Sequence, residues 1–119
     1  MRNVLAALIA ACVLGLSIRA LAATETITGE LVERSCYMTD PKSNVGEAHK
    51  GCAVSCARGG LPVALVTSDG KVYTVTGALA ADNNAKLLPH IAHKVELTGE
   101  VTEANGRLTI EATDLKMAK

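Results

Sequence analysis

Residues 26–33 read TITGELVE, and residues 97–103 repeat the pattern as LTGEVTE. Both segments alternate apolar and polar side chains and are rich in β-branched residues, which is typical of half-buried β-strands. Each has a glycine in its interior, Gly29 in the first and Gly99 in the second. A glycine inside a strand marks a sharp bend or a bulge, as at a barrel corner. Only two copies occur and their surroundings differ, so the pattern predicts two strands with the same bend rather than a repeat protein.

Three further segments predict strands. Residues 62–67 (PVALVT) and 71–76 (KVYTVT) flank Ser68-Asp69-Gly70, and the Asp-Gly pair favours a hairpin turn. Residues 107–112 follow a second turn at Ala104-Asn105-Gly106, after the strand that begins near Lys94. The sequence therefore predicts a mainly β fold: a small five-stranded OB-like barrel with one short inserted helix after the first strand. A roll or half-open barrel is the alternative, and neither shape specifies a function.

The inserted helix is expected over residues 45–58. It follows a loop, DPKSN at residues 40–44, whose Asn44 can cap the helix and form a capping box with Glu47. Gly59 is expected to end the helix in the left-handed conformation. Two glycines, Gly46 and Gly51, weaken the helix by about 1 kcal/mol each relative to alanine. Packing or cross-linking must therefore stabilise it.

The N-terminus predicts export. Arg2 precedes an apolar run over residues 4–18, and Ala20-Leu21-Ala22 supplies a small-x-small cleavage site. This is the layout of a signal peptide at residues 1–22, cleaved near Ala22, and residues 23–119 then form a single domain with a Cys/His insert at about 36–60. The expected location is periplasmic or secreted, without stable membrane insertion after cleavage. Alternatively, IAAC at residues 9–12 resembles a lipobox, which would make the protein a lipoprotein anchored at Cys12.

The charge pattern does not favour nucleic acid as a partner. The chain has 12 basic and 12 acidic residues, and removal of the signal peptide takes away Arg2 and Arg19, so the remaining domain is slightly acidic. No cluster of lysine and arginine is seen along the sequence, and Tyr37 and Tyr73 are the only aromatic residues. Nucleic-acid sites need a cationic surface, and single-strand sites need aromatic side chains for stacking.

Three cysteines remain after cleavage: Cys36, Cys52 and Cys56. An odd number in an exported protein leaves at least one thiol free, bound or paired to another chain. Because a helix advances about 100° per residue, His49, Cys52 and Cys56 are expected within one sector of about 60°. Cys36 could close over that face from the end of the first strand. The resulting Cys3His set suits tetrahedral zinc, and thiolates also suit Cu(I), for which Met38 is a possible extra ligand.

Other uses of these residues stay open. A disulfide from Cys36 to Cys52 or Cys56 would tie the weak helix to the barrel and leave the third cysteine free. Redox catalysis is less favoured, because the C-x3-C spacing differs from the C-x2-C of thioredoxin-like sites. His90 and His93 are expected to be exposed loop residues, although they could join a site. With no acid/base pair or catalytic motif in the sequence, the protein is predicted not to be an enzyme.

Several motifs together resemble a group of small exported bacterial proteins. They are Gly-Glu-Leu-Val-Glu-x-x-Cys-Tyr over residues 29–37, His-x-x-Cys-Ala-x-x-Cys over residues 49–56, Gly-x-Pro over residues 60–62 and Asp-Gly-Lys-Val-Tyr over residues 69–73. That group is similar to OB-like barrels with a Cys/His insert. The resemblance implies Cys36, His49, Cys52 and Cys56 as the site residues, and it implies no particular activity.

The functional hypothesis is an exported, non-enzymatic binding domain whose Cys/His site binds a transition metal, zinc or copper. The alternative is a disulfide-stabilised structural or interaction module that binds a partner protein or another envelope component. A third possibility is a thiol oxidoreductase. The expected partners are thus a metal ion or an unknown envelope protein.

Overall fold

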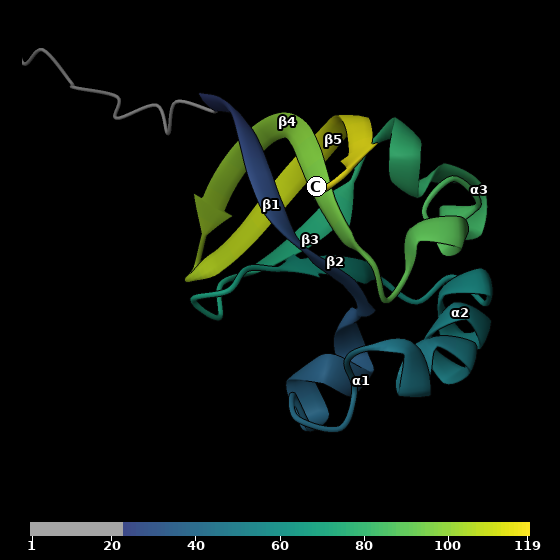
Figure 1. Cartoon of the computed structure of the whole chain (residues 1–119). Helices are drawn as coiled ribbons and strands as arrows, with labels where there is room; N and C mark the ends of the chain where they lie inside the picture. Colours follow the sequence, from purple (N-terminus) through teal and green to yellow (C-terminus); the bar gives the residue numbers. More distant parts are fainter. Residues whose placement is uncertain (1–22) are drawn as a thin grey trace, which may run out of the picture.

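The computed structural model describes residues 23–119, so the predicted signal peptide and the alternative lipidation site at Cys12 lie outside the described residues. Five strands form one sheet: β1 (Ala23–Glu33), β2 (Val63–Val66), β3 (Val72–Thr76), β4 (Lys94–Ala104) and β5 (Arg107–Met117). The sheet closes in a ring in the order β1-β2-β3-β5-β4 (Figure 1). Only β3 and β5 pair in parallel; the other neighbours are antiparallel. The predicted mainly β fold with five strands is confirmed.

The two strand glycines lie where the ring bends. β1 pairs with β4 over Ala23–Glu30 and with β2 over Glu30–Glu33, so it changes partner beside Gly29. A Cβ at Gly29 would overlap the backbone carbonyl of Val66. The register of β4 and β5 shifts between Thr98 and Gly99, and a Cβ at Gly99 would overlap the backbone of Glu111. Each strand therefore changes partner or register beside its glycine, and the neighbouring backbone leaves no room for a side chain there.

The helical insert between β1 and β2 differs from the prediction. It contains α1 (Arg34–Thr39), η1 (Glu47–His49) and α2 (Lys50–Arg58), so the helix expected over residues 45–58 is two segments and α1 is additional. Asn44 does not cap the later helix. Its side-chain amide donates to the carbonyls of Cys36 (2.8 Å) and Asp40 (2.9 Å) and so closes the end of α1. The left-handed residue after α2 is Gly60 (φ 97°), not Gly59.

The connection between β3 and β4 is held to the insert by one buried amide. It contains η2 (Ala78–Ala80), α3 (Ala81–Asn84) and η3 (Leu88–His90). Three successive residues, 82–84 (Asp-Asn-Asn), have positive φ, which short polar side chains tolerate better than other residues. Asn84 is buried, and its side chain donates to the carbonyls of Ala57 (2.9 Å) and Leu61 (3.0 Å) at the end of α2. The end of α2 thereby gains hydrogen-bond donors that its own turn cannot supply.

The core fills the ring and continues under α2. The ring interior holds Leu31, Leu65, Tyr73, Val75, Val95, Leu97 and Ile110, and the helical segments add Ala53, Ala57, Leu87 and Ile91. Ala53 and Ala57 are one helical turn apart, and their small side chains let α2 approach the strands closely. Figure 1 shows α1 and α2 on the same side of the strands, with the β3–β4 connection beside α2. Within residues 23–119, no helix is long and apolar enough to cross a membrane.

Candidate functional site

Glu33 ends β1 and starts α1. Its two carboxylate oxygens accept hydrogen bonds from the backbone N–H groups of Ser35 (2.9 Å) and Cys36 (2.8 Å), which a helix start would otherwise leave without partners. The Glu33 side chain is fully buried (0% exposed). Glutamate is not among the preferred N-cap residues, and Cys36 was predicted at the end of the first strand rather than in a helix. Cys36 consequently lies in the first turn of α1, directly beside a buried carboxylate.

Three thiols come together between α1 and α2. Cys36 is in α1, and Cys52 and Cys56 are one turn apart in α2. All three are free; Cys52 is exposed, and the other two are half-buried. Hydrogen bonds of the Cys56 side chain with both Cys52 and Cys36 contribute to its pKa, so its sulfur is close to the other two. We refer to Cys36, Cys52 and Cys56 as the thiol cluster. The mutual effects on pKa indicate that the three side chains are neighbours.

Glu33 keeps the Cys36 thiol protonated. The hydrogen bond to Glu33, then burial, then the negative charges of Glu33, Cys56 and Cys52 raise the pKa of Cys36 to about 12. For Glu33 itself, burial acts to raise the pKa, but the hydrogen bonds from Cys36 and Ser35 outweigh burial and hold it below its ordinary value. At neutral pH the pair is therefore a carboxylate that accepts and a thiol that donates.

Cys56 is also a weak acid. Burial is the largest cause that raises the pKa of Cys56. The charge and hydrogen bond of Cys52 and the charge of Glu33 raise it further, whereas the hydrogen bond with Cys36 lowers it. Only the thiolate attacks electrophiles or binds metal, so the raised pKa values predict slow reactions of Cys36 and Cys56 at neutral pH. A metal ion that binds them must displace their protons.

The free energy of unfolding is expected to fall as the pH rises from about 9 to about 12. The pKa of Cys36 is about 12 in the folded protein, against an ordinary value of 9.0. A group whose pKa is raised by folding stabilises the folded state fully at pH values below its unfolded pKa. This stabilisation is lost as the pH rises through the folded pKa. Urea unfolding of the reduced protein at about pH 8 and pH 11 measures the change. Cys36→Ser should lose less stability over this range, whereas equal losses would contradict the assignment.

His49 lies apart from the predicted ligand set. It sits at the end of η1, and its side chain lines a small cavity with Ala53 and Ile91; none of the three cysteines lines this cavity. Its Nε2 atom is buried and has no hydrogen-bond partner among residues 23–119. The expected common face assumed one continuous α-helix, but residues 47–49 form a 3-10 turn, which changes the angle between His49 and α2. His49 and the three cysteines therefore have different surroundings, and the four-residue ligand set stays a prediction.

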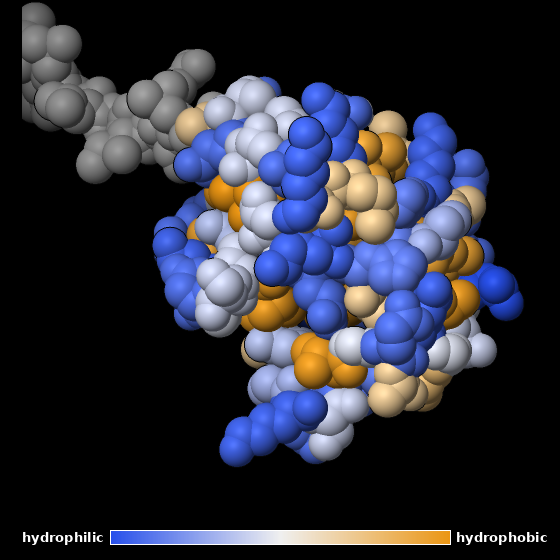
Figure 2. Space-filling view, in the orientation of Figure 1, coloured by the Kyte–Doolittle hydropathy of each residue, from blue (hydrophilic) through white to orange (hydrophobic). Residues whose placement is uncertain are grey.

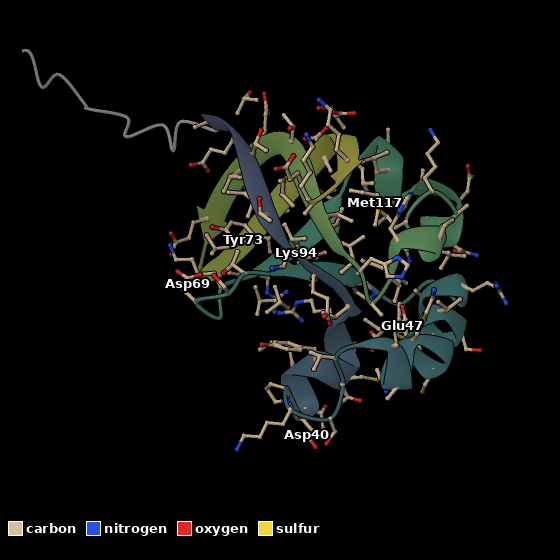
Figure 3. The ribbon with its side chains drawn as sticks, viewed as in Figure 1. Asp40, Glu47, Asp69, Tyr73, Lys94 and Met117 are labelled. Atoms are coloured by element: carbon tan, nitrogen blue, oxygen red, sulfur yellow. The ribbon has the colours of Figure 1, made fainter. Side chains whose placement is uncertain are left out.

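The other sulfur and imidazole candidates have different surroundings. Met38 is exposed and lines a separate cavity with Arg34 and Lys71. His93 contacts Glu47, with 2.9 Å between Nε2 and Oε1, and so links the start of β4 to η1; Figure 3 labels Glu47 on the part of the insert nearest the strands. His90 is half-buried at the end of η3. His93 lies in a loop as expected, but neither histidine is exposed as predicted: both are half-buried, and His93 contacts the insert.

A groove separates the insert from the ring. It has a volume of about 400 Å³, with Tyr37, Pro41 and Val45 on the insert side and Gly29, Val66 and Lys94 among the residues on the strand side. Figure 2 shows the surface hollowed between the strands and the lower, helical part of the molecule. Tyr37 follows Cys36 in α1, so the groove and the thiol cluster share one short helix.

Within the part of the chain that the structure describes, no three or more His, Cys, Asp or Glu side chains are already arranged as a metal-ligand group. The thiol cluster therefore does not form such a group in this structure. No family model matches the chain, and neither a curated protein nor a solved structure is significantly similar to it. The resemblance to small exported proteins thus stays a prediction, and function is inferred from the described residues alone.

Proposed function

We propose that this protein is an exported, non-enzymatic domain that binds a soft transition metal through the thiolates of Cys36, Cys52 and Cys56. The closeness of three free thiols from two helices is the observation that supports this function. Metal binding would require the three cysteine side chains to rotate toward one centre, since they form no metal-ligand group within residues 23–119. The ring itself we propose to be of the OB type, on the basis of its strand order and its single parallel pair.

Cu(I) is the preferred metal in this proposal, and zinc is the alternative. Thiolate ligands favour Cu(I), whereas structural zinc sites take four ligands in a tetrahedron. His49, the predicted fourth ligand, lines a different cavity. The Glu33 carboxylate is near Cys36, but both of its oxygens already accept backbone hydrogen bonds. Three sulfurs without a ready fourth ligand therefore suit copper better than zinc.

Reduced wild-type protein is expected to bind about one equivalent of Cu(I), and Cys52→Ser or Cys56→Ser is expected to weaken binding by about a hundredfold or more, because each variant removes one thiolate ligand. Anaerobic competition with a Cu(I) chelator measures the affinity. Ser55→Ala, between the two cysteines on α2, is the matched control and should bind like wild type. His49→Gln should bind within about threefold of wild type if only the thiols are ligands.

Metal analysis of protein purified from the periplasm completes the test. The proposal is overturned if fresh protein holds less than about a tenth of an equivalent of copper and zinc together and the reduced form takes up neither. Equal affinity of Ser55→Ala and Cys56→Ser would also contradict it. Zinc uptake that needs His49 would instead support the four-ligand site that the sequence predicted.

A disulfide-stabilised interaction module is the second candidate. The contact of Cys56 with Cys36 would let the pair oxidise and join α1 to α2, and the groove beside Tyr37 would offer a partner protein or envelope component an apolar surface. Intact mass with and without reductant separates the two candidates, since a bridge removes two hydrogens and leaves one alkylatable thiol. A thiol oxidoreductase is less well supported, because the pKa values of Cys36 and Cys56 are raised rather than lowered.

A further inference from the structure

A second cavity lies on another part of the molecule, between α1, the start of β3 and the turn that joins β4 to β5. Its volume is about 450 Å³, within the range of small-molecule sites. Three cationic side chains line it, Arg34, Lys71 and Arg107, together with the apolar side chains of Met38, Val72 and Leu108. The cations are 37 and 36 residues apart in sequence, so no charge cluster was visible along the chain.

The pairing of β3 with β5 brings two of the cations together. Tyr73 lies opposite Leu108 in the parallel pair, which places Lys71-Val72 and Arg107-Leu108 at neighbouring ends of adjacent strands. Arg34 is added from the first position of α1, the helix that Glu33 caps. Three separate elements thus each contribute one cation to the same cavity.

The positive charge of this cavity is not neutralised by ion pairs. The salt bridges found within residues 23–119 join His93 to Glu47 and Lys116 to Asp114, and neither involves a cation of the cavity. No aspartate or glutamate lines the cavity. Asp69 is close enough to Lys71 for the lysine charge to lower its pKa, after the larger effect of a hydrogen bond from Thr67, but Asp69 is not part of the lining.

The guanidinium of Arg34 has an unused hydrogen-bond donor. Its Nε atom is buried and has no partner in the part of the chain described. A buried donor without a partner is unfavourable, and rotation of the Arg34 side chain toward a ligand oxygen would remove this cost. Guanidinium groups bind carboxylates and phosphates through paired, charge-assisted hydrogen bonds. The cavity therefore has room and positive charge for an anion, and Arg34, one of its lining residues, has one donor without a partner.

We propose that this cavity binds a small organic anion with at least two oxyanion groups, carboxylates or phosphates, on a compact body that packs against Val72 and Leu108. Arg34 and Arg107 bind the oxyanion groups, and Lys71 adds a third positive charge. No aromatic side chain lines the cavity, so it lacks the stacking surface that single-stranded nucleic acids use. The inference is independent of the thiol cluster and needs no metal.

The test titrates the reduced, metal-free protein with citrate and with inorganic pyrophosphate and follows backbone amides by NMR. Both anions should shift amides of residues 34–38, 71–72 and 105–108, and sucrose, a neutral control, should not. The stronger of the two anions identifies carboxylate or phosphate as the natural group. Arg107→Gln and Lys71→Gln should each weaken binding by about tenfold. Lys86→Gln is the matched control, because Lys86 is an exposed cation outside the cavity, and it should change affinity by less than about twofold.

Three results would overturn the proposal. The first is the absence of shifts at these amides with both anions. The second is an equal loss of affinity in Lys86→Gln, which would indicate non-specific charge attraction. The third is tighter binding of a short single-stranded oligonucleotide than of either small anion, lost in the same variants. Unchanged amide spectra of Arg107→Gln and Lys71→Gln away from the substitutions show that these variants are folded.

Discussion

Gly99→Ala is expected to destabilise the protein by at least about 3 kcal/mol or to prevent folding. Gly99 sits at the register shift of β4 and β5, where an added Cβ would overlap the backbone carbonyl of Glu111 and lie 2.8 Å from the Cα of Ala112. Both neighbours are backbone atoms, which cannot move aside by changing a side-chain rotamer. Relief would require β4 and β5 to separate, and the ring closes through this pair.

Urea unfolding followed by circular dichroism measures the effect, and Gly51→Ala is the matched control. Gly51 is in α2, has open space around its Cα and does not have positive φ. Alanine there should stabilise the protein by about 0.5–1 kcal/mol, through higher helix propensity. If Gly99→Ala stayed within about 1 kcal/mol of wild type, the bulge would not be the close contact described.

The strands could be predicted because their signals are local. Alternating side chains mark a strand within eight residues, and the Asn105-Gly106 and Asp69-Gly70 pairs mark the turns between them. Gly106, Gly70 and Asn105 all have positive φ, as those turns need. The bends at Gly29 and Gly99 were predictable for the same reason, since a glycine in a strand pattern points to a close approach even when the partner is unknown.

The details of the candidate site could not be predicted, because they depend on partners far apart in sequence. The N-cap of α1 is a buried glutamate, a residue without the usual capping preference. Asn44 is a residue type that often caps the start of a helix, yet its side-chain amide donates to carbonyls at the end of the preceding helix. The cavity of Arg34, Lys71 and Arg107 exists only after β3 and β5 pair. Residue pattern identified the cysteines, but tertiary contacts decided which of the predicted ligands lie together.

Glu33 connects the stability of the fold to the chemistry of the thiols. The same buried carboxylate caps α1 through the N–H groups of Ser35 and Cys36 and raises the pKa of the Cys36 thiol. Glutamine at position 33 would have the same size and keep one acceptor oxygen for the N–H group of Ser35 or Cys36, but it would carry no charge. Glu33→Gln should therefore separate the two roles, with a modest loss of stability of about 1–2 kcal/mol and a large change in thiol reactivity.

Glu33→Gln is expected to increase the rate of Cys36 alkylation at pH 8 by about tenfold. The pKa of Cys36, about 12 in the wild type, should move back toward 9.0 when its largest cause is removed. A fall of about two units gives roughly a hundredfold more thiolate, while the lower basicity of the sulfur reduces its reactivity by about tenfold. Iodoacetamide labelling with peptide-level mass spectrometry measures each cysteine separately.

The exposed Cys52 is the internal reference for this measurement, because its rate should change by less than about twofold while that of Cys36 rises. Glu47→Gln removes an exposed carboxylate elsewhere in the insert and should leave Cys36 unchanged. The pH dependence of Cys36 labelling distinguishes two explanations of a faster rate: a lower pKa of the thiol, or opening of α1. A lower pH midpoint for Cys36 labelling supports control by the Glu33 charge, whereas a faster rate with an unchanged midpoint would mean that α1 opens. An unchanged rate would contradict the role of Glu33 in keeping the thiol protonated.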